Sequence, residues 1–258
     1  MDLQLAGKSA IVTGASRGLG FAIARSLARE GCNLVICDRT ADELQAAAAD
    51  LRAEGVGVEG LQLDITDAGA GDALVGAARE KYGRLDVFVG NAGGNRRGKF
   101  VETSDDDWEA ILDLNLKAHI RTSRAAVPLL KSSGQGAITF ISSIFGRESG
   151  GAGLSIYNTT KSALISLSKV MAAELAADGV RVNSVAPGSI RFEGGSWDRR
   201  VKEQPEKMKQ FVADNIPMGR FGRADEIGDV VAFLSSPRAS WISGACLNVD
   251  GVQSHSLI

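Results

Sequence analysis

A tyrosine and a lysine four residues apart, Tyr157 and Lys161, have the types and the spacing to do acid/base chemistry. Apolar side chains recur at helical spacing after Lys161, and positions i and i+4 of a helix lie on one face, about 6 Å apart along the axis. An ammonium roughly 4 Å from a phenol favours the phenolate by about 4 kcal/mol at an effective dielectric of about 20, which is about three pKa units. The pair therefore predicts a phenol whose pKa falls toward about 7 and which serves as a general acid/base. The same spacing also occurs in ordinary helices with a solvated lysine, so the rest of the chain must support the prediction.

The composition is that of a folded protein without a strong charge bias. The chain has 258 residues, of which 44% are hydrophobic and 23% charged, and its formal net charge is −2. The absence of a basic tract disfavours a nucleic-acid partner. No apolar run has membrane-spanning length, and the first residues lack the pattern of a secretory signal. We therefore expect a cytoplasmic protein that works without a membrane.

The histidines and cysteines do not predict a metal site. His119 and His255 are too far apart in the sequence, and Cys32, Cys37 and Cys246 lack the spacing of metal ligands. We interpret the cysteines as small core residues that stay reduced in the cytoplasm. A metal-dependent mechanism is disfavoured for the same reason.

Short apolar runs alternate with longer amphipathic stretches along the chain. Several runs are apolar throughout, as is typical of strands covered on both faces. This alternation predicts parallel pairing with right-handed crossovers, which is a doubly wound α/β sheet of the Rossmann type in one domain over residues 1–258. The expected strands are 9–12, 33–37, 58–63, 85–89, 137–141, 180–185 and 245–249, and the expected helices are roughly 18–30, 41–54, 67–81, 105–132, 155–178 and 224–235.

Residues 189–223 interrupt the alternation. They hold aromatic residues, glycines and a short charged helical candidate near 205–214. Because they follow a predicted strand at its carboxyl end, where ligands bind in open sheets, we expect a lid or a substrate loop. A purely structural excursion is the alternative. The segment offers Phe192, Trp197 and Phe211 for an apolar or cyclic substrate, and Arg191, Arg199 and Arg200 for an anionic one.

The first predicted strand leads into a glycine-rich turn, residues 13–20, at which a helix begins. Its glycines would let backbone N–H groups approach a pyrophosphate at the helix N-terminus, where the helix dipole favours an anion. The spacing differs from the Gly-x-Gly-x-x-Gly fingerprint, but a strand before and a helix after are the context that a dinucleotide site needs. A glycine-rich turn without a ligand is the alternative. The residues expected to contact a cofactor here are Gly14, Ser16, Arg17, Gly18, Leu19 and Gly20.

Asp38 ends the second predicted strand, 18 residues after Gly20. An acidic side chain at this place accepts hydrogen bonds from the adenosine ribose and repels a 2′-phosphate, which favours NAD. Arg39 and Arg17 could instead hold that phosphate, so NADP stays possible. Asp38 could also be the N-cap of the next helix.

Together these features resemble the short-chain dehydrogenase/reductase family of the classical type, over essentially the whole chain. The resemblance implies a nicotinamide dinucleotide cofactor and adds contact residues to those of the glycine-rich turn. Asp64 and Ile65 look like the adenine-contacting pair. The other implied contacts are Arg39 beside Asp38, the Asn91-Ala92-Gly93 segment after the fourth strand, the Pro187-Gly188 segment that borders the nicotinamide, Ile190, and Tyr157 and Lys161 themselves.

The same resemblance implies a catalytic set of Asn115, Ser143, Tyr157 and Lys161. Ser143 would hold the substrate oxygen, Tyr157 would exchange the hydroxyl proton, and Lys161 would lower the pKa of Tyr157 and bind the nicotinamide ribose. Asn115 would hold a water that links Lys161 to solvent. Ser143 lies 14 residues before Tyr157, one more than the family pattern, and this leaves Ser142 as an alternative.

Two further residues depart from the family pattern. Gly90 replaces the first asparagine of an Asn-Asn-Ala-Gly motif, and Arg191 stands where a threonine often contacts the carboxamide. Arg191 could face an anionic substrate group or be a solvated charge.

These observations predict an NAD(P)-dependent oxidoreductase that interconverts a secondary alcohol and a ketone. One alternative is a reductase of 3-oxoacyl thioesters on acyl carrier protein, using NADPH. An alternative of another class is a catalytically silent, dinucleotide-binding regulator. The resemblance also implies a homotetramer, with the tail 250–258 near an interface. Contacts between subunits could come from Leu112, Leu116, His119, Leu164 and Leu167, which could equally be core residues.

Overall fold

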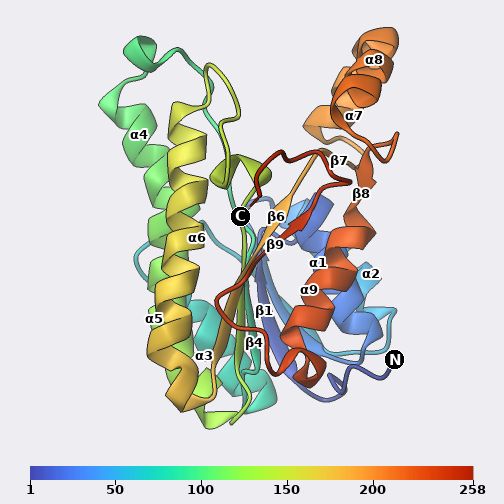
Figure 1. Ribbon diagram of the computed structural model, residues 1–258. Helices are drawn as coiled ribbons and strands as arrows, with labels where there is room; N and C mark the ends of the chain where they lie inside the picture. The colour runs from blue at the N-terminus through green and yellow to red at the C-terminus, as the bar shows by residue number, and fades with distance from the viewer. Residues whose placement is uncertain (258) are drawn as a thin grey trace.

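A seven-stranded parallel sheet forms the centre of the protein, with helices on both faces (Figure 1). The computed structural model describes residues 1–257, so only Ile258 of the predicted domain lies outside the description. The strand order β3-β2-β1-β4-β5-β6-β9 reverses direction at β1, as in doubly wound folds. The predicted fold, a single Rossmann-type domain, is confirmed.

The predicted strands and helices are present with small shifts of their ends. The strands are β1 (Ser9–Thr13), β2 (Asn33–Asp38), β3 (Val58–Gln62), β4 (Val87–Gly90), β5 (Ala137–Ile141), β6 (Arg181–Pro187), β7 (Ile190–Arg191), β8 (Gly222–Arg223) and β9 (Cys246–Val249). The α-helices are α1 (Gly18–Arg29), α2 (Ala41–Arg52), α3 (Ala70–Tyr82), α4 (Asp105–Leu112), α5 (Ala118–Ser132), α6 (Ser155–Leu175), α7 (Ser196–Glu203), α8 (Pro205–Asn215) and α9 (Ala224–Ser235).

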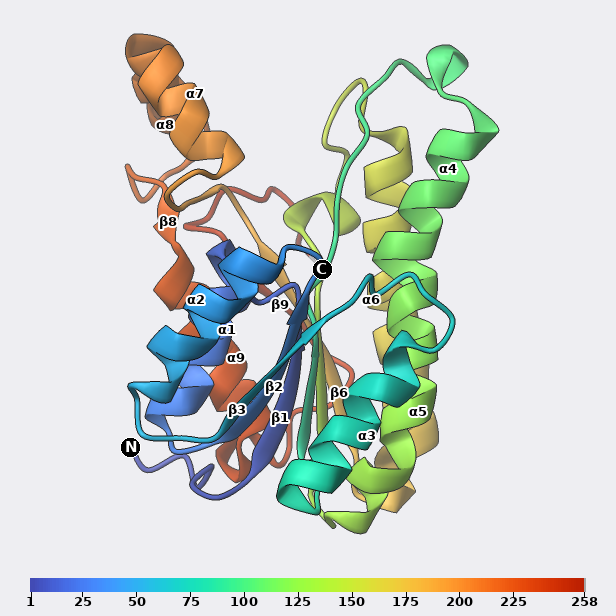
Figure 2. The same ribbon diagram turned by 180° about the vertical axis from the view of Figure 1, so that it is seen from behind.

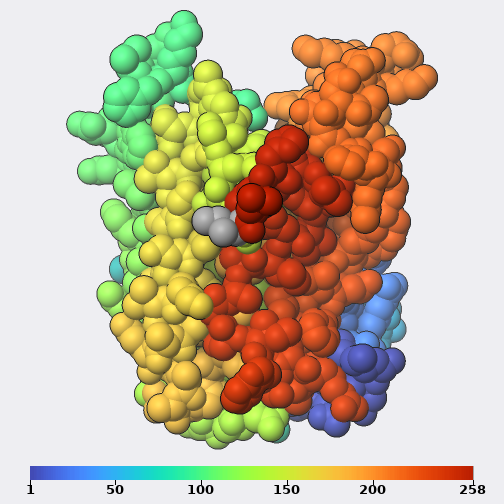
Figure 3. Space-filling model, viewed as in Figure 1, coloured from blue at the N-terminus to red at the C-terminus, as the bar shows by residue number. Residues whose placement is uncertain are grey.

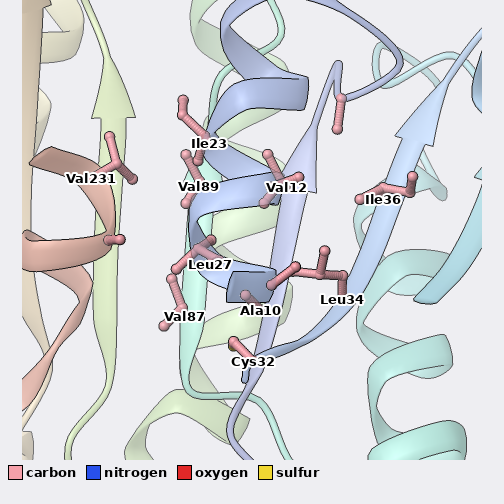
Figure 4. Packing of buried hydrophobic residues seen from close by; sticks show 14 of the residues in the cluster. Ala10, Val12, Ile23, Leu27, Cys32, Leu34, Ile36, Val87, Val89 and Val231 are labelled. Carbon is pink, nitrogen blue, oxygen red and sulfur yellow. The ribbon is translucent and has the colours of Figure 1, made fainter. Parts of the chain in front are cut away.

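Two hydrophobic layers hold the sheet, one under each set of helices. Helices α1, α2 and α9 cover one face, and α3, α5 and α6 cover the other (Figure 2). In β1 the side chains alternate between the layers, because Ala10 and Val12 pack with α1 while Ile11 packs on the opposite side (Figure 4). Burial on both faces explains why several of the predicted strands, such as β1 and β5, are apolar nearly throughout.

The long predicted helix 105–132 is interrupted by a π-helical turn. Asp113–Lys117 forms this turn between α4 and α5. Such turns occur often at functional sites, and this one carries Asn115. His119, on the following helix α5, is fully buried, and so is Leu164 on α6. These two residues are therefore core residues, which is the second of the two possibilities predicted for them.

Residues 189–223 form a projection beyond the carboxyl ends of the strands, opposite α4 (Figure 1). The strands β7 and β8 pair at its base, and the C-terminal segment braces it, because the Gln253 side chain accepts a hydrogen bond from the Ser189 backbone at 2.8 Å. The predicted helix near 205–214 is α8. The spacing of apolar residues did not predict α7, because the buried side chain of this helix is Asp198 rather than an apolar residue.

Gly90, at the end of β4, is predicted to tolerate no side chain. A Cβ atom there would lie 2.7 Å from the Phe140 ring and 2.8 Å from His119 Nδ1, which explains why this chain lacks the asparagine of the family motif. We expect Gly90→Asn to lower the free energy of unfolding by about 2 kcal/mol in chemical denaturation, because the packed core must shift.

Gly76→Ala is the matched control for this substitution. Gly76 is exposed in the middle of α3 with open space around it, so the alanine should raise the free energy of unfolding by about 0.5–1 kcal/mol. A Gly90→Asn protein as stable as the parent would contradict the packing argument.

Candidate active site

A cavity of about 610 Å³ lies at the carboxyl ends of the strands. The molecular surface is hollowed between α4 and the projection that carries α7 and α8 (Figure 3). Most residues predicted from the sequence line this cavity, while Ser16 and Asn115 lie behind its wall. The predicted residues in the lining are Gly14, Arg17, Gly18, Leu19, Gly20, Asp38, Arg39, Asp64, Ile65, Asn91, Ala92, Gly93, Ser143, Tyr157, Lys161, Pro187, Gly188 and Ile190.

The glycine-rich turn has the shape of an anion cradle. Gly14 and Gly18 have φ values of +63° and +60°, which L side chains rarely adopt. A Cβ on Gly20 would lie 2.0 Å from the Gly14 carbonyl oxygen, so only glycine lets α1 start so close to β1. No side chain caps the start of α1. Its first N–H groups therefore point at the cavity with the positive end of the helix dipole.

Thr13 and Asn91 fasten this turn to the end of β4. The Thr13 hydroxyl accepts hydrogen bonds from the backbone N–H groups of Asn91 and Ala92, both at 3.0 Å. The Asn91 amide donates to the carbonyl oxygens of Thr13 and Gly14 at 2.9 and 3.0 Å. Thr13 was not among the predicted site residues, and its position between a strand and a glycine-rich turn was the available signal.

His119 supports the same segment from below. Its Nε2 lies 2.9 Å from the Ala92 carbonyl oxygen. Burial lowers the pKa of His119 to about 3, and the Lys161 charge acts in the same direction, so the ring is neutral near pH 7. The neutral ring donates through Nε2 to this carbonyl.

Carboxylates dominate the end of the cavity beside β2. Asp38 accepts hydrogen bonds from the Ser16 hydroxyl at 2.7 Å and from the Arg39 N–H at 2.8 Å. Glu43 joins the lining, 3.8 Å from the Arg17 guanidinium. The residue preceding α2 is Thr40, so Asp38 is not its N-cap. This end therefore offers two carboxylates to a ribose.

Tyr157 and Lys161 lie together on α6 in the cavity. Lys161 Nζ is 5.8 Å from the centre of the Tyr157 ring and donates to the Ile141 carbonyl at 2.8 Å. Burial lowers the pKa of Lys161 to about 8. Burial also raises the pKa of Tyr157, against the opposing effects of a hydrogen bond with Ser143 and the charge of Arg97. The predicted lowering of the Tyr157 pKa by Lys161 is therefore wrong, because the ammonium faces a carbonyl of β5.

The two serines after β5 have different tasks. The Ser142 hydroxyl donates to the Lys161 carbonyl at 2.8 Å and thereby ties α6 to β5. The Ser143 hydroxyl reaches Tyr157 in the cavity and accepts from the Phe145 N–H at 3.1 Å. The geometry favours Ser143 as the residue that shares a substrate oxygen with Tyr157.

Asn115 is fully buried, and its amide is engaged by the protein. Its Oδ1 accepts from the Gly94 N–H at 2.8 Å, and its Nδ2 donates to the Gly94 carbonyl and the Thr160 hydroxyl at 2.9 and 3.0 Å. Asn115 therefore positions the segment beside Lys161. These contacts do not test the predicted water at Asn115, which stays a prediction.

Arg191 neither faces the cavity nor stands free in solvent. Its guanidinium pairs with Asp198 at 3.0 Å, and Lys202 pairs with the same carboxylate at 2.7 Å. Hydrogen bonds from Lys202 and Arg191 lower the pKa of Asp198 to about 2. Both alternatives considered for Arg191 are therefore replaced by a third, a contact that holds α7 to β7.

Within residues 1–257, no helix combines the length and the apolar character needed to cross a bilayer. The same residues contain no group of three or more His, Cys, Asp or Glu side chains arranged to hold a metal ion.

A glycine cradle at the switch point of a doubly wound sheet, with a buried tyrosine and lysine beside it, defines a dinucleotide-dependent oxidoreductase. Comparison with known proteins supports the same class. The sequence profile described as enoyl-(acyl carrier protein) reductase matches residues 14–251. A tropinone reductase homolog from Arabidopsis thaliana is 38% identical over 249 residues, which are 96% of this chain and 92% of the relative.

Solved structures show the same likeness. L-Sorbose reductase from Gluconobacter frateurii, complexed with NADPH and L-sorbose, is 32% identical and matches with a TM-score of 0.94 over 100% of both chains. A 7α-hydroxysteroid dehydrogenase complexed with NADH is 30% identical, with a TM-score of 0.90 over 100% of this chain and 98% of the other. The chain belongs to the classical short-chain dehydrogenase/reductase family, and it is an NAD(P)-dependent oxidoreductase that acts on alcohol and ketone groups.

Arg97 is predicted to influence the proton equilibrium of Tyr157. Arg97 is exposed and has no ion-pair partner in the described part of the chain, and its charge lowers the pKa of Tyr157. We expect Arg97→Ala to shift the ionisation of Tyr157 to higher pH. The chain has two tyrosines, Tyr82 and Tyr157. In a Tyr82→Phe background, ultraviolet titration of phenol ionisation therefore reports on Tyr157 alone.

The control is Arg96→Ala, since Arg96 is paired with Asp107 at 2.6 Å. This variant should leave the pH at which Tyr157 ionises unchanged. Equal shifts in the two variants would contradict a specific effect of Arg97.

Proposed function

We propose that the protein uses NAD(H) to interconvert a secondary alcohol and a ketone, with Tyr157 as the general acid/base. The observation that carries this proposal is the meeting of Tyr157, Ser143 and Lys161 in one cavity with the glycine cradle. A buried phenol and a serine hydroxyl side by side can hold one substrate oxygen between them. The family description names an acyl-carrier-protein substrate, so the thioester alternative stays open.

The cavity fits a nicotinamide dinucleotide by its shape and charge. A side chain at Gly14, Gly18 or Gly20 would fill the cradle, and the N–H groups at the start of α1 suit a diphosphate. Asp38 and Glu43 suit the adenosine ribose hydroxyls, and Pro187-Gly188 would border the nicotinamide. The bound nicotinamide supplies or accepts the hydride.

In the proposed mechanism, Ser143 donates a hydrogen bond to the substrate oxygen and orients it toward Tyr157. Burial keeps the Tyr157 phenol protonated, so it can give its proton to the oxygen during ketone reduction. The phenolate that remains is stabilised by the hydrogen bond from Ser143 and by the charge of Arg97, the two groups that lower the pKa of Tyr157. Lys161, held by the Ile141 carbonyl, would bind the nicotinamide ribose. In alcohol oxidation the same groups act in reverse.

We infer a preference for NAD over NADP from the charges at the ribose end. Asp38 and Glu43 would repel a 2′-phosphate. The two arginines that could bind that phosphate are near other carboxylates, because Arg17 lies 3.8 Å from Glu43 and Arg39 lies 3.6 Å from Asp64.

We also infer a cytoplasmic homotetramer. The edge strand β9 and its surroundings expose the apolar side chains Trp241 and Leu247, and α6 exposes Val170. Such apolar surface at a sheet edge and on a long helix is suited to subunit contacts. The cysteines are free, as in reducing compartments. A light-scattering mass of one chain would contradict the tetramer.

Replacing the general acid/base should abolish turnover without preventing cofactor binding. We expect Tyr157→Phe to lower kcat by about 10³-fold, because proton transfer to the substrate oxygen is lost. The Kd for NADH should change by less than about fivefold, since one lost hydroxyl hydrogen bond is worth about 1 kcal/mol.

Tyr82→Phe is the control, because Tyr82 donates to the Leu34 carbonyl at 3.1 Å and is not part of the cavity lining. Its turnover should equal that of the parent. Near-normal turnover in Tyr157→Phe would refute the assignment, and a parent protein that binds NADH but converts no alcohol or ketone of a broad panel would favour the regulator.

The cofactor preference should follow the charge of Asp38. We expect kcat/KM to be about 100-fold higher with NADH than with NADPH, because like charges placed side by side cost several kcal/mol. Asp38→Asn keeps the shape of the side chain and removes its charge, so it should narrow this ratio. A parent protein that prefers NADPH would overturn the use of Asp38.

A further inference from the structure

The ring of Phe192 lies between the glycine-rich turn and the start of α7. A Cβ on Gly18 would come within 2.8 Å of the Phe192 ring, and a Cβ on Gly195 would come within 2.8 Å of the same ring. Gly18, Phe192 and Gly195 are therefore stacked in contact, and all three line the cavity. The glycine-rich turn and the start of α7 are thus two walls of one cavity, joined by the Phe192 ring.

Four cationic side chains line the cavity, and each of them contacts another group of the protein. Arg17 lies near Glu43 and Arg39 near Asp64, while Lys161 donates to the Ile141 carbonyl. The fourth is Arg199 on α7, which donates to the Gly194 carbonyl at 2.8 Å and has no carboxylate partner within residues 1–257. Within residues 1–257, Arg199 and Lys161 are the lining cations without an acidic partner, and Arg199 is the exposed one of the two, because Lys161 is buried against the Ile141 carbonyl.

The packing of α7 separates Arg199 from the other cations of the projection. Asp198 is buried and holds Arg191 and Lys202, and it also accepts from the Gly194 N–H at 3.2 Å. Arg200 stacks on Trp197, with its guanidinium carbon 4.9 Å from the centre of the indole ring. These contacts fix the orientation of α7, and they leave Arg199 as the arginine of this helix that faces the cavity.

We propose that Arg199 and the first N–H groups of α7 bind the diphosphate of the nicotinamide dinucleotide from the side opposite the glycine-rich turn. A guanidinium presents a fork of N–H donors that matches phosphate oxygens, and unpaired N–H groups at a helix start favour an anion. The projection 189–223 is then a clasp for the cofactor as well as a wall of the substrate site. This inference rests on the proposed function, and it assigns Arg199 to the cofactor rather than to an anionic substrate.

Calorimetric binding of NADH and of ADP-ribose tests this proposal, because ADP-ribose keeps the diphosphate and lacks the nicotinamide. We expect Arg199→Ala to raise the Kd of both ligands by about tenfold, the loss of one charge-assisted hydrogen bond. The KM for the ketone at saturating NADH should stay unchanged. Lys207→Ala is the matched control, because it removes the same charge from an exposed position on α8 outside the cavity lining.

Three results would overturn the proposal. The first is an Arg199→Ala variant whose Kd for NADH is unchanged. The second is a raised Kd for NADH with an unchanged Kd for ADP-ribose. The third is an equal rise of both Kd values in Lys207→Ala. A raised ketone KM with unchanged cofactor binding would assign Arg199 to the substrate instead. Arg199→Gln is expected to raise the same two Kd values, and it replaces the alanine variant in the test if circular dichroism shows that the alanine variant is unfolded.

Failure of the proposed function would look different from failure of this inference. A parent protein that does not bind NADH, or that converts no alcohol or ketone, refutes the proposed function itself. A parent that binds and turns over normally, with an Arg199→Ala variant that binds as tightly, refutes the clasp alone.

Discussion

The docking of α6 on the end of β5 is the contact on which the rest of the site depends. Lys161 Nζ donates to the Ile141 carbonyl, and the Ser142 hydroxyl donates to the Lys161 carbonyl, both at 2.8 Å. Burying an ammonium is costly unless its donors are satisfied, so the helix can sit in very few positions against the strand. Gly146 permits the approach, since a Cβ there would lie 2.8 Å from the Lys161 carbonyl oxygen. This docking sets Tyr157, one turn earlier, beside Ser143.

Charge is distributed along the cavity in a way that follows from the same architecture. Parallel strands end at one edge of the sheet, so residues from distant parts of the sequence meet there. The end of β2 and the start of α2 bring Asp38 and Glu43 to one side of the cavity, while β5 and α6 bring the buried Lys161 to another. The projection adds Arg199 above the glycine-rich turn.

Local patterns predicted the elements well and the contacts between side chains less well. The apolar runs predicted every strand of the large sheet, because burial on both faces leaves a direct mark on composition. Helix α7 left no such mark, since its buried residue is an aspartate that is neutralised by Arg191 and Lys202. The role of Arg191 depends on that distant pairing. No spacing rule along the chain could have indicated it.

The sequence by itself determined the fold class, the cradle for a dinucleotide and the pairing of Tyr157 with Lys161 on one helix face. These features depend on glycine conformation and on hydrophobic and helical periodicity, which act over a few residues. The tertiary structure decided which serine reaches Tyr157, that burial raises rather than lowers the pKa of this tyrosine, and which arginine faces the cavity. Desolvation and ion pairing depend on groups that are brought together from distant parts of the chain, so only the folded protein determines them.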